Sequence, residues 1–193
     1  YFNTMKLAKK LEKPDVVIGS SAHPLAAVAA IRLARKFKCK SIVEVRDLWP
    51  ETIVAYNLLK RNNPIAKMLY LGEKWIYKKA DKLVFTMEGG KDYIVERGWD
   101  DRQGGPVRLD KVFHINNGVD LEVFDYNREH NVIDDEDLIN DETFKVIYAG
   151  SIRLINNVKR IVDAAQVVKN MGASKIVFLI YGSGNDKEYL EKY

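Results

Sequence analysis

The sequence has few of the residues that build disulfides and metal sites. Its single cysteine, Cys39, excludes an internal disulfide and a cysteine-based metal cluster. Three histidines, His23, His114 and His130, are widely spaced along the chain. That spacing argues against a zinc site, and we expect no metal.

Long apolar runs and a strong excess of one charge are also missing. No apolar stretch is long enough to span a bilayer, and no signal peptide is recognisable, so we expect a cytoplasmic protein. A net charge of +4 is too small for a dedicated nucleic-acid binder. The dinucleotide and P-loop fingerprints are absent, so the sequence predicts no NAD or ATP cofactor.

What remains is a regular alternation of strand and helix patterns. Apolar, β-branched runs predict strands at 15–20, 41–45, 82–86, 111–115, 143–149 and 175–181. Helical spacing predicts helices at 25–37, 64–79, 91–97 and 158–171, and again from 188. This order predicts an α/β fold of parallel strands joined by right-handed crossovers.

A charged segment divides this pattern in two. Residues 120–142 contain ten acidic residues and one basic residue, Arg128. Such a stretch is typical of a solvated linker or surface excursion. Residues 1–13 and 188–193 both have the pattern of partial helices, so we expect a piece of a longer protein.

The strand at 41–45 ends in an unusual set of side chains. Arg46 and Asp47 follow it directly, then Trp49, and Pro50 prevents the strand from continuing. In open α/β sheets, ligands bind just beyond the carboxyl ends of strands, which indicates a site here. The alternative is that Arg46 and Asp47 cap the next helix and Trp49 packs. The residues alone support both interpretations equally.

His23 follows the first strand and precedes Pro24. A histidine at a strand end can orient a hydroxyl or accept a proton. The alternative is an ordinary helix start, with Pro24 in the first turn and His23 incidental.

Glycines stand at two later strand ends, as Gly150-Ser151 and as Gly182 and Gly184. Glycine lets a backbone approach a ligand closely, and the helix N-terminus that follows suits phosphate. A tight strand-to-helix turn also needs glycine without any ligand, and this alternative stays open.

The helix at 64–79 is basic and amphipathic, with lysines at Lys67, Lys74, Lys78 and Lys79. Such a helix can lie on an anionic membrane surface, where aromatic residues such as Trp75 suit the interface. The alternative is a core helix with a lysine-rich solvated face.

Taken in order, these segments resemble a known family. They read SSAHP from 20, VEVRDLWPE from 43, ADKLVFTMEGGKDYIVERG from 80, VFHINNGVD from 112, KVIYAGSIR from 145 and FLIYGSGNDKEYLEK from 178. The set resembles the family 4 glycosyltransferases of the GT-B fold, above all bacterial enzymes of cell-surface polysaccharide, lipopolysaccharide O-antigen and capsule assembly.

The resemblance implies two incomplete Rossmann-like domains that face each other across a cleft. Residues 1–118 would be the later part of an acceptor domain, 119–142 an acidic connection, and 143–193 the first part of a nucleotide-sugar domain. The implied reaction is transfer of a sugar with retention of configuration and without a metal. The donor would be a UDP-sugar, and the acceptor a lipid-linked molecule or an oligosaccharide.

The resemblance also implies roles for individual residues of the site. Arg46 and Asp47 match the catalytic strand end, where many relatives have His-Asp. A guanidinium suits an acceptor phosphate better than it suits proton transfer. His23 and Trp49 would help to bind the acceptor.

On the donor side the implied residues are Gly150, Ser151, Arg153, Gly182 and Gly184. Many relatives have arginine directly after the first glycine and a lysine one turn later. Here those positions are Ser151 and Asn156, so Arg153 is the candidate substitute, and Lys159 lies nearby.

Two parts of the family pattern would lie outside residues 1–193: the opening strand with its glycine-rich loop, and the paired glutamates that hold the donor. We therefore expect these residues to be inactive alone. Two rival hypotheses remain, a sugar-nucleotide epimerase of the same fold and a non-catalytic binding module. Absence of paired glutamates in the intact protein would count against a transferase.

Overall fold

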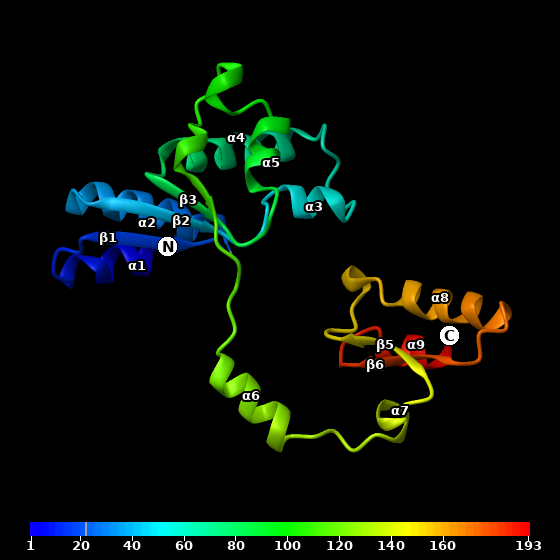
Figure 1. Ribbon diagram of the computed structural model, residues 1–193. Coiled ribbons are helices and arrows are strands. Elements are labelled where there is room, and N and C mark those ends of the chain that lie inside the picture. The colour runs from blue at the N-terminus through cyan, green and yellow to red at the C-terminus, as the bar shows by residue number, and fades with distance from the viewer. Residues whose placement is uncertain (22) are drawn as a thin grey trace. The chain divides into compact units, whose positions relative to one another are not determined.

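The computed structural model describes residues 1–21 and 23–193. The chain divides into two compact units, Tyr1–Gly118 and Val119–Tyr193. Each unit is built from parallel strands with helices between them (Figure 1), so the predicted α/β fold is confirmed.

The first unit contains a four-stranded sheet in the order β1-β2-β3-β4. The strands are β1 (Val16–Ser20), β2 (Lys40–Val45), β3 (Lys82–Phe85) and β4 (Val112–His114). All neighbours are parallel, and Val43 of β2 pairs with Gly19 on one side and Leu83 on the other. The carboxyl ends of all four strands therefore lie at one edge of the sheet.

Helices cover one face of this sheet. They are α2 (Pro24–Phe37), α3 (Glu51–Ala55), α4 (Pro64–Lys79) and α5 (Gly90–Glu96), and α1 (Phe2–Leu7) precedes β1. Short 3-10 turns lie at Ala8–Lys10, Asp101–Gln103 and Leu109–Lys111. Side chains from α2, α4 and α5 form a continuous core with alternate residues of β2 and β3, such as Val43, Val45, Leu83 and Phe85.

Helix α4 has the predicted bounds because its end signals are local. The Asn63 side chain accepts a hydrogen bond from Ile65 N at 2.8 Å, and Pro64 occupies the first helical position. Lys78 and Lys79 occupy the last turn, where cations complement the helix dipole. The buried face is Ala66, Tyr70, Glu73, Ile76 and Tyr77.

The second unit contains β5 (Phe144–Ala149) and β6 (Ile176–Tyr181), joined by the 3-10 turn Leu154–Asn156 and α8 (Lys159–Asn170), and followed by α9 (Lys187–Lys192). The acidic stretch expected as a linker contains two helices, α6 (Leu121–His130) and α7 (Glu136–Ile139). Its carboxylates help to form them. Asp120 accepts hydrogen bonds from Glu122 N and Val123 N, and Asp135 caps α7 in the same way.

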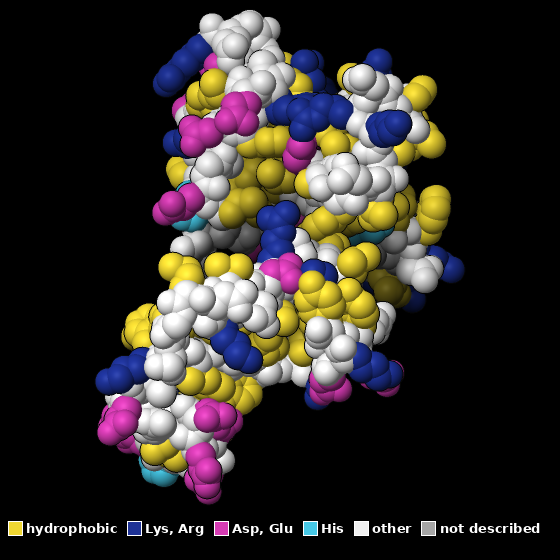
Figure 2. All heavy atoms as spheres, turned by 90° about the vertical axis from the view of Figure 1, so that its right-hand side faces the viewer, with side chains coloured by type: hydrophobic (Ala, Val, Ile, Leu, Met, Phe, Trp, Pro, Cys, Tyr) yellow, Lys and Arg dark blue, Asp and Glu magenta, His cyan; other side chains and the backbone are white. Residues whose placement is uncertain are grey.

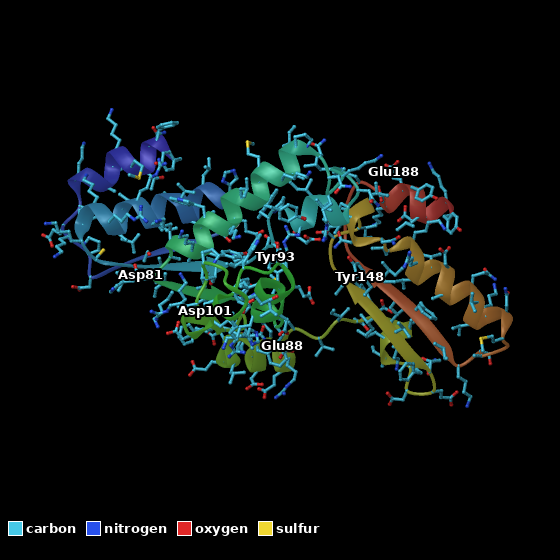
Figure 3. All side chains as sticks on the ribbon, turned by 90° about the horizontal axis from the view of Figure 1, so that it is seen from above. Asp81, Glu88, Tyr93, Asp101, Tyr148 and Glu188 are labelled. Carbon is cyan, nitrogen blue, oxygen red and sulfur yellow. The ribbon has the colours of Figure 1, made fainter. Side chains whose placement is uncertain are left out.

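Contacts at the opposite edge of the first sheet are structural. Asp81, labelled in Figure 3, accepts hydrogen bonds from the Ser41 backbone N–H and hydroxyl, both at 2.9 Å. Burial tends to raise the pKa of Asp81, but these bonds outweigh it and lower the pKa. Lys111 Nζ donates to the carbonyl oxygens of Lys78 and Ala80 at the end of α4. Among the described residues, no helix is both long and apolar enough to cross a bilayer.

Candidate functional site

The first candidate site lies at the carboxyl edge of the four-stranded sheet. Backbone hydrogen bonds continue one residue past the strands, from Ser21 N to Glu44 O at 2.7 Å and from Thr86 N to Val45 O at 3.1 Å. The segments that start at Ser21, Arg46 and Thr86 therefore leave adjacent strands at one edge. Sequence reasoning had not singled out Thr86, whose only signal is its place after a strand.

Arg46 and Asp47 are both exposed directly after β2. Helix α3 begins at Glu51, and its N-cap is Pro50, with no side-chain capping hydrogen bond. The side chains of the pair therefore do not cap the next helix, and that half of the alternative is wrong. Neither side chain forms an ion pair with another residue of 1–21 or 23–193. An exposed guanidinium can bind a phosphate through two parallel hydrogen bonds, and the carboxylate beside it can accept from a hydroxyl.

Trp49 and Asp47 line one cavity of about 220 Å³, which lies between the end of β2, the start of α2 and helix α4. Ser21 lines the same cavity. The Trp49 indole N–H is buried and has no hydrogen-bond partner among the residues that the structure describes. The structure thus brings together Asp47 and Trp49, two of the predicted site residues, at this cavity. The indole N–H of Trp49 is the polar group that the described residues leave unsatisfied there.

His23 takes a different position. It is the N-cap of α2, and its Nδ1 accepts a hydrogen bond from Leu25 N at 3.2 Å. It lines a hollow between β1 and α2 and does not line the cavity of Asp47 and Trp49. A capping role thus accounts for His23 locally. Ala22, which precedes it in the SSAHP segment, lies outside the described residues.

A buried carboxyl group that sequence reasoning missed lies in the wall of the Trp49 cavity. Glu73 of α4 is 5% exposed and accepts hydrogen bonds from the hydroxyls of Tyr77 and Tyr93, both at 2.8 Å. Tyr93, labelled in Figure 3, comes from α5. Burial raises the pKa of Glu73 to about 7, and the two hydrogen bonds and the charge of Arg97 offset it only in part. The one available signal was its spacing, because Glu73 shares a helix face with Tyr70 and Tyr77.

The second candidate site is formed by the loops after β5 and β6. Gly150 N donates to Tyr181 O at 3.0 Å, and Ile152 N donates to Ser183 O at 2.9 Å. A Cβ on Gly182 would lie 1.9 Å from Gly150 O, and one on Gly184 would lie 2.0 Å from Ile152 O. The packing of the two loops against each other therefore requires glycine at positions 182 and 184. This agrees with the alternative that a tight turn needs glycine without any ligand. A donor-binding role for Gly150, Gly182 and Gly184 stays a prediction.

The polar and basic residues near these loops differ in the hydrogen bonds and ion pairs that they form. Ser151 is exposed, and its carbonyl accepts a hydrogen bond from the hydroxyl of Tyr148 at 2.8 Å. Lys159 pairs with Asp163 at 3.0 Å and donates to the Tyr193 hydroxyl at 2.6 Å. Arg153 is exposed and forms no ion pair within the described part of the chain. Of the two cations, Arg153 is the one available to a ligand.

Two further features bear on ligand chemistry. Helix α8 starts after Val158 without a side-chain cap, but Arg160 N and Ile161 N of its first turn already donate to the carbonyl oxygens of Asn157 and Val158, at 3.0 and 2.9 Å. Among the described residues, no group of three or more His, Cys, Asp or Glu side chains could hold a metal ion.

Comparison with solved structures defines the class of fold. The chain resembles the crystal structure of Anabaena Alr3699/HepE in complex with UDP, with a TM-score of 0.62 and 11% identity, over 98% of this chain and 46% of that one. It also resembles HepE in complex with UDP and glucose, with a TM-score of 0.57 and 11% identity, over 98% of this chain and 45% of that one. The fold is thus of the GT-B type.

Comparison with sequences then gives the family. Residues 4–104, more than half of the chain, match the model of the glycosyl transferase 4-like domain, and the chain belongs to this family. It is 26% identical to the probable glycosyltransferase WbjE of Pseudomonas aeruginosa over 98% of this chain and 45% of that protein. The chain therefore spans about half the length of the curated relative that it matches.

Proposed function

We propose that the protein containing this chain is a retaining glycosyltransferase. It moves a sugar from a UDP-sugar to a lipid-linked or oligosaccharide acceptor in the assembly of a cell-surface polysaccharide. The observation that carries the proposal is the family match over residues 4–104. The name of WbjE and the UDP bound in the HepE structures support the reaction class and the nucleotide.

In this proposal the first unit binds the acceptor. Arg46 binds an acceptor phosphate, Asp47 accepts a hydrogen bond from the reacting hydroxyl, and His23 and Trp49 contact the rest of the acceptor. The support is the position of Arg46 and Asp47, which are exposed and unpaired within 1–21 and 23–193 at the carboxyl edge of the sheet.

The second unit binds the diphosphate of the donor. Departure of a diphosphate needs cations or helix N-termini close to the developing charge. The exposed Arg153 offers the cation, and Ser151, Gly150, Gly182 and Gly184 form the loops near it. The two units thus contribute different halves of one reaction.

Replacing Arg46 tests the assignment of the first unit. In the intact protein, assayed with a panel of nucleotide-sugars, Arg46→Ala should lower transfer to the acceptor about tenfold, since a charge-assisted hydrogen bond is lost. Donor affinity, measured by calorimetry with UDP, should stay within about twofold. Arg35→Ala, an exposed arginine on α2, is the matched control. If donor affinity collapses instead, Arg46 belongs to the donor site.

We also propose that the protein binds peripherally to an anionic membrane surface and that α4 makes the contact. Apolar side chains lie at the surface among lysines and arginines in the view of Figure 2. On α4 itself, Ile65, Met68 and Leu71 are exposed, although they are apolar. Lys67 and Lys78 are exposed on the same helix. An exposed apolar ridge with flanking lysines is the pattern of an interfacial helix.

Neutralising the α4 lysines tests this contact. Changing Lys67, Lys74, Lys78 and Lys79 to glutamine should weaken flotation with vesicles of anionic lipid at least tenfold, because each lysine near such a surface contributes about 1 kcal/mol. The matched control changes four exposed lysines elsewhere, Lys10, Lys36, Lys169 and Lys192. Equal flotation of the two variants would favour a helix whose lysines are only solvated.

A further inference from the structure

A basic hollow of about 470 Å³ lies on the side of α4 opposite to the Trp49 cavity. Residues of α4, of the loop before it and of the segment after α5 line this hollow. None of the described residues that line it also lines the cavity of Asp47 and Trp49. The hollow is therefore separate from that candidate site. Its lining contains four cations, Arg61, Lys67, Lys74 and Arg97.

The guanidinium of Arg97 lies against aromatic rings and not against a carboxylate. Its Cζ is 3.7 Å from the centroid of the Tyr70 ring and 5.1 Å from that of Trp99. Stacking on a ring attracts the cation and fixes the plane of its hydrogen-bond donors. Arg97 is half-buried, its Nε has no hydrogen-bond partner, and it forms no ion pair within the described part of the chain. A half-buried guanidinium without an anionic partner indicates a place for one.

The carboxylates beside this hollow have other partners. Glu51 forms an ion pair with Arg61 and accepts a hydrogen bond from the Tyr70 hydroxyl at 2.6 Å. Burial and this hydrogen bond raise the pKa of Tyr70 to about 12, so Tyr70 is neutral at physiological pH. Both oxygens of Glu73 accept hydrogen bonds from two other tyrosines. Glu51 thus fixes the ring on which Arg97 lies, but neither carboxylate pairs with Arg97.

The described residues leave three positive charges of the hollow without a counter-charge. Lys67 and Lys74 occupy positions i and i+7 of α4, which places them on one helix face. Like Arg97, neither forms an ion pair among residues 1–21 and 23–193. Like charges that share a hollow repel one another, so an anion bound among them stabilises the folded state.

We propose that this hollow binds the phosphate monoester group of a ligand that is neither the sugar donor nor the acceptor. Arg97 donates two parallel hydrogen bonds to the phosphate, and Lys67 and Lys74 supply the remaining charge.

The arrangement of the cations favours phosphate over carboxylate. A phosphate monoester has three terminal oxygens and close to two negative charges, so cations on different sides of a hollow can all contact it. A carboxylate has two oxygens in one plane, and the fork of Arg97 alone would satisfy both. The volume of about 470 Å³ also holds part of the molecule that carries the phosphate. Two sources share this chemistry, a soluble phosphorylated metabolite and the head group of phosphatidic acid.

Calorimetry of the intact protein with glycerol phosphate tests the soluble source. Changing both Lys67 and Lys74 to glutamine should weaken binding about tenfold or more, because two charge-assisted contacts to the phosphate are lost. The matched control changes Lys78 and Lys79 to glutamine, which removes the same charge from the same helix outside the hollow. The control should bind within about twofold of the wild type. Equal weakening in the two double variants would mean that only the net charge of α4 matters, and the inference would fail.

Flotation with vesicles tests the lipid source. Phosphatidic acid, a monoester, is compared with phosphatidylglycerol, a diester, in phosphatidylcholine vesicles of equal zeta potential. The wild type and the Lys78 and Lys79 variant should prefer phosphatidic acid about fivefold or more, and the Lys67 and Lys74 variant should lose this preference. Saturable binding of glycerol phosphate identifies the soluble source, and a preference for phosphatidic acid without it identifies the lipid. If the wild type shows neither, the inference is overturned.

Arg97→Lys tests the guanidinium fork without removing the charge. A lysine cannot form two parallel hydrogen bonds, so the monoester that binds the wild type should bind about fivefold more weakly or worse. Urea denaturation shows whether the variant is folded, and the two lysine variants decide the question if it is not. Wild-type affinity in folded Arg97→Lys would overturn the role of Arg97. All these measurements report binding alone, so their outcome does not depend on whether the protein transfers a sugar.

Discussion

Glu73→Ala should lower the free energy of unfolding of the first unit by about 3 kcal/mol. The substitution removes the acceptor for two tyrosine hydroxyls, and each unsatisfied buried donor costs about 1–3 kcal/mol. It also leaves a void between α4 and α5. For residues 1–193, urea denaturation followed by tryptophan fluorescence reports on this unit, because Trp49, Trp75 and Trp99 all lie within it. Glu96→Ala, an exposed carboxylate at the end of α5, should change stability by less than about 0.5 kcal/mol.

The same carboxyl group makes stability depend on pH. Its pKa is about 7 in the folded chain against an ordinary value of 4.5. The folded state therefore holds the proton more tightly, and the stabilisation is complete below pH 4.5 and is lost as pH rises through 7. Relative to Glu73→Gln, the wild type should lose about 3 kcal/mol over that range. If the free energy of unfolding changes with pH equally in the two proteins, folding does not raise the pKa of Glu73.

Gly182→Ala should destabilise the β5–β6 pair by more than about 3 kcal/mol. The added Cβ would lie 1.9 Å from Gly150 O and 3.1 Å from the Gly150 carbonyl carbon, and backbone atoms cannot move aside as a flexible side chain can. The hydrogen bonds of Gly150 N and Ile152 N across the two loops would have to break. Hydrogen–deuterium exchange of the β5 and β6 amides in the intact protein should accelerate at least a hundredfold.

Ser183→Ala is the matched control for Gly182→Ala. It changes the residue between the two glycines, and Ser183 is exposed, so exchange should stay near the wild-type rate. If both variants exchange like the wild type, the loops rearrange at little cost. Glycine at position 182 would then have to be explained by a ligand.

Most elements could be predicted because their signals are local. The bounds of α4 follow from Asn63 and Pro64 at one end and Lys78 and Lys79 at the other, all adjacent in sequence. The two helices of the acidic stretch were not predicted, for the opposite reason. Its charge density dominates the pattern, and it hides the capping roles of Asp120 and Asp135 that start α6 and α7.

The site could be predicted only in part. Arg46 and Asp47 were found because a strand ends there, a fact that sequence periodicity shows. The environment of Glu73 depends on Tyr93, twenty residues away on another helix, and no local pattern reports that contact. The clash distances at Gly182 likewise depend on Gly150, so sequence alone could not decide between ligand approach and loop packing.

The strand order of the first unit has a consequence for how the chain folds during synthesis. Each strand pairs with the strand before it, in the order β1-β2-β3-β4. Among these four strands, none has to be inserted between two that are already paired. The sheet can therefore grow at a single edge as the ribosome releases each strand–helix segment, and the cavity by Trp49 is complete only once α4 has emerged.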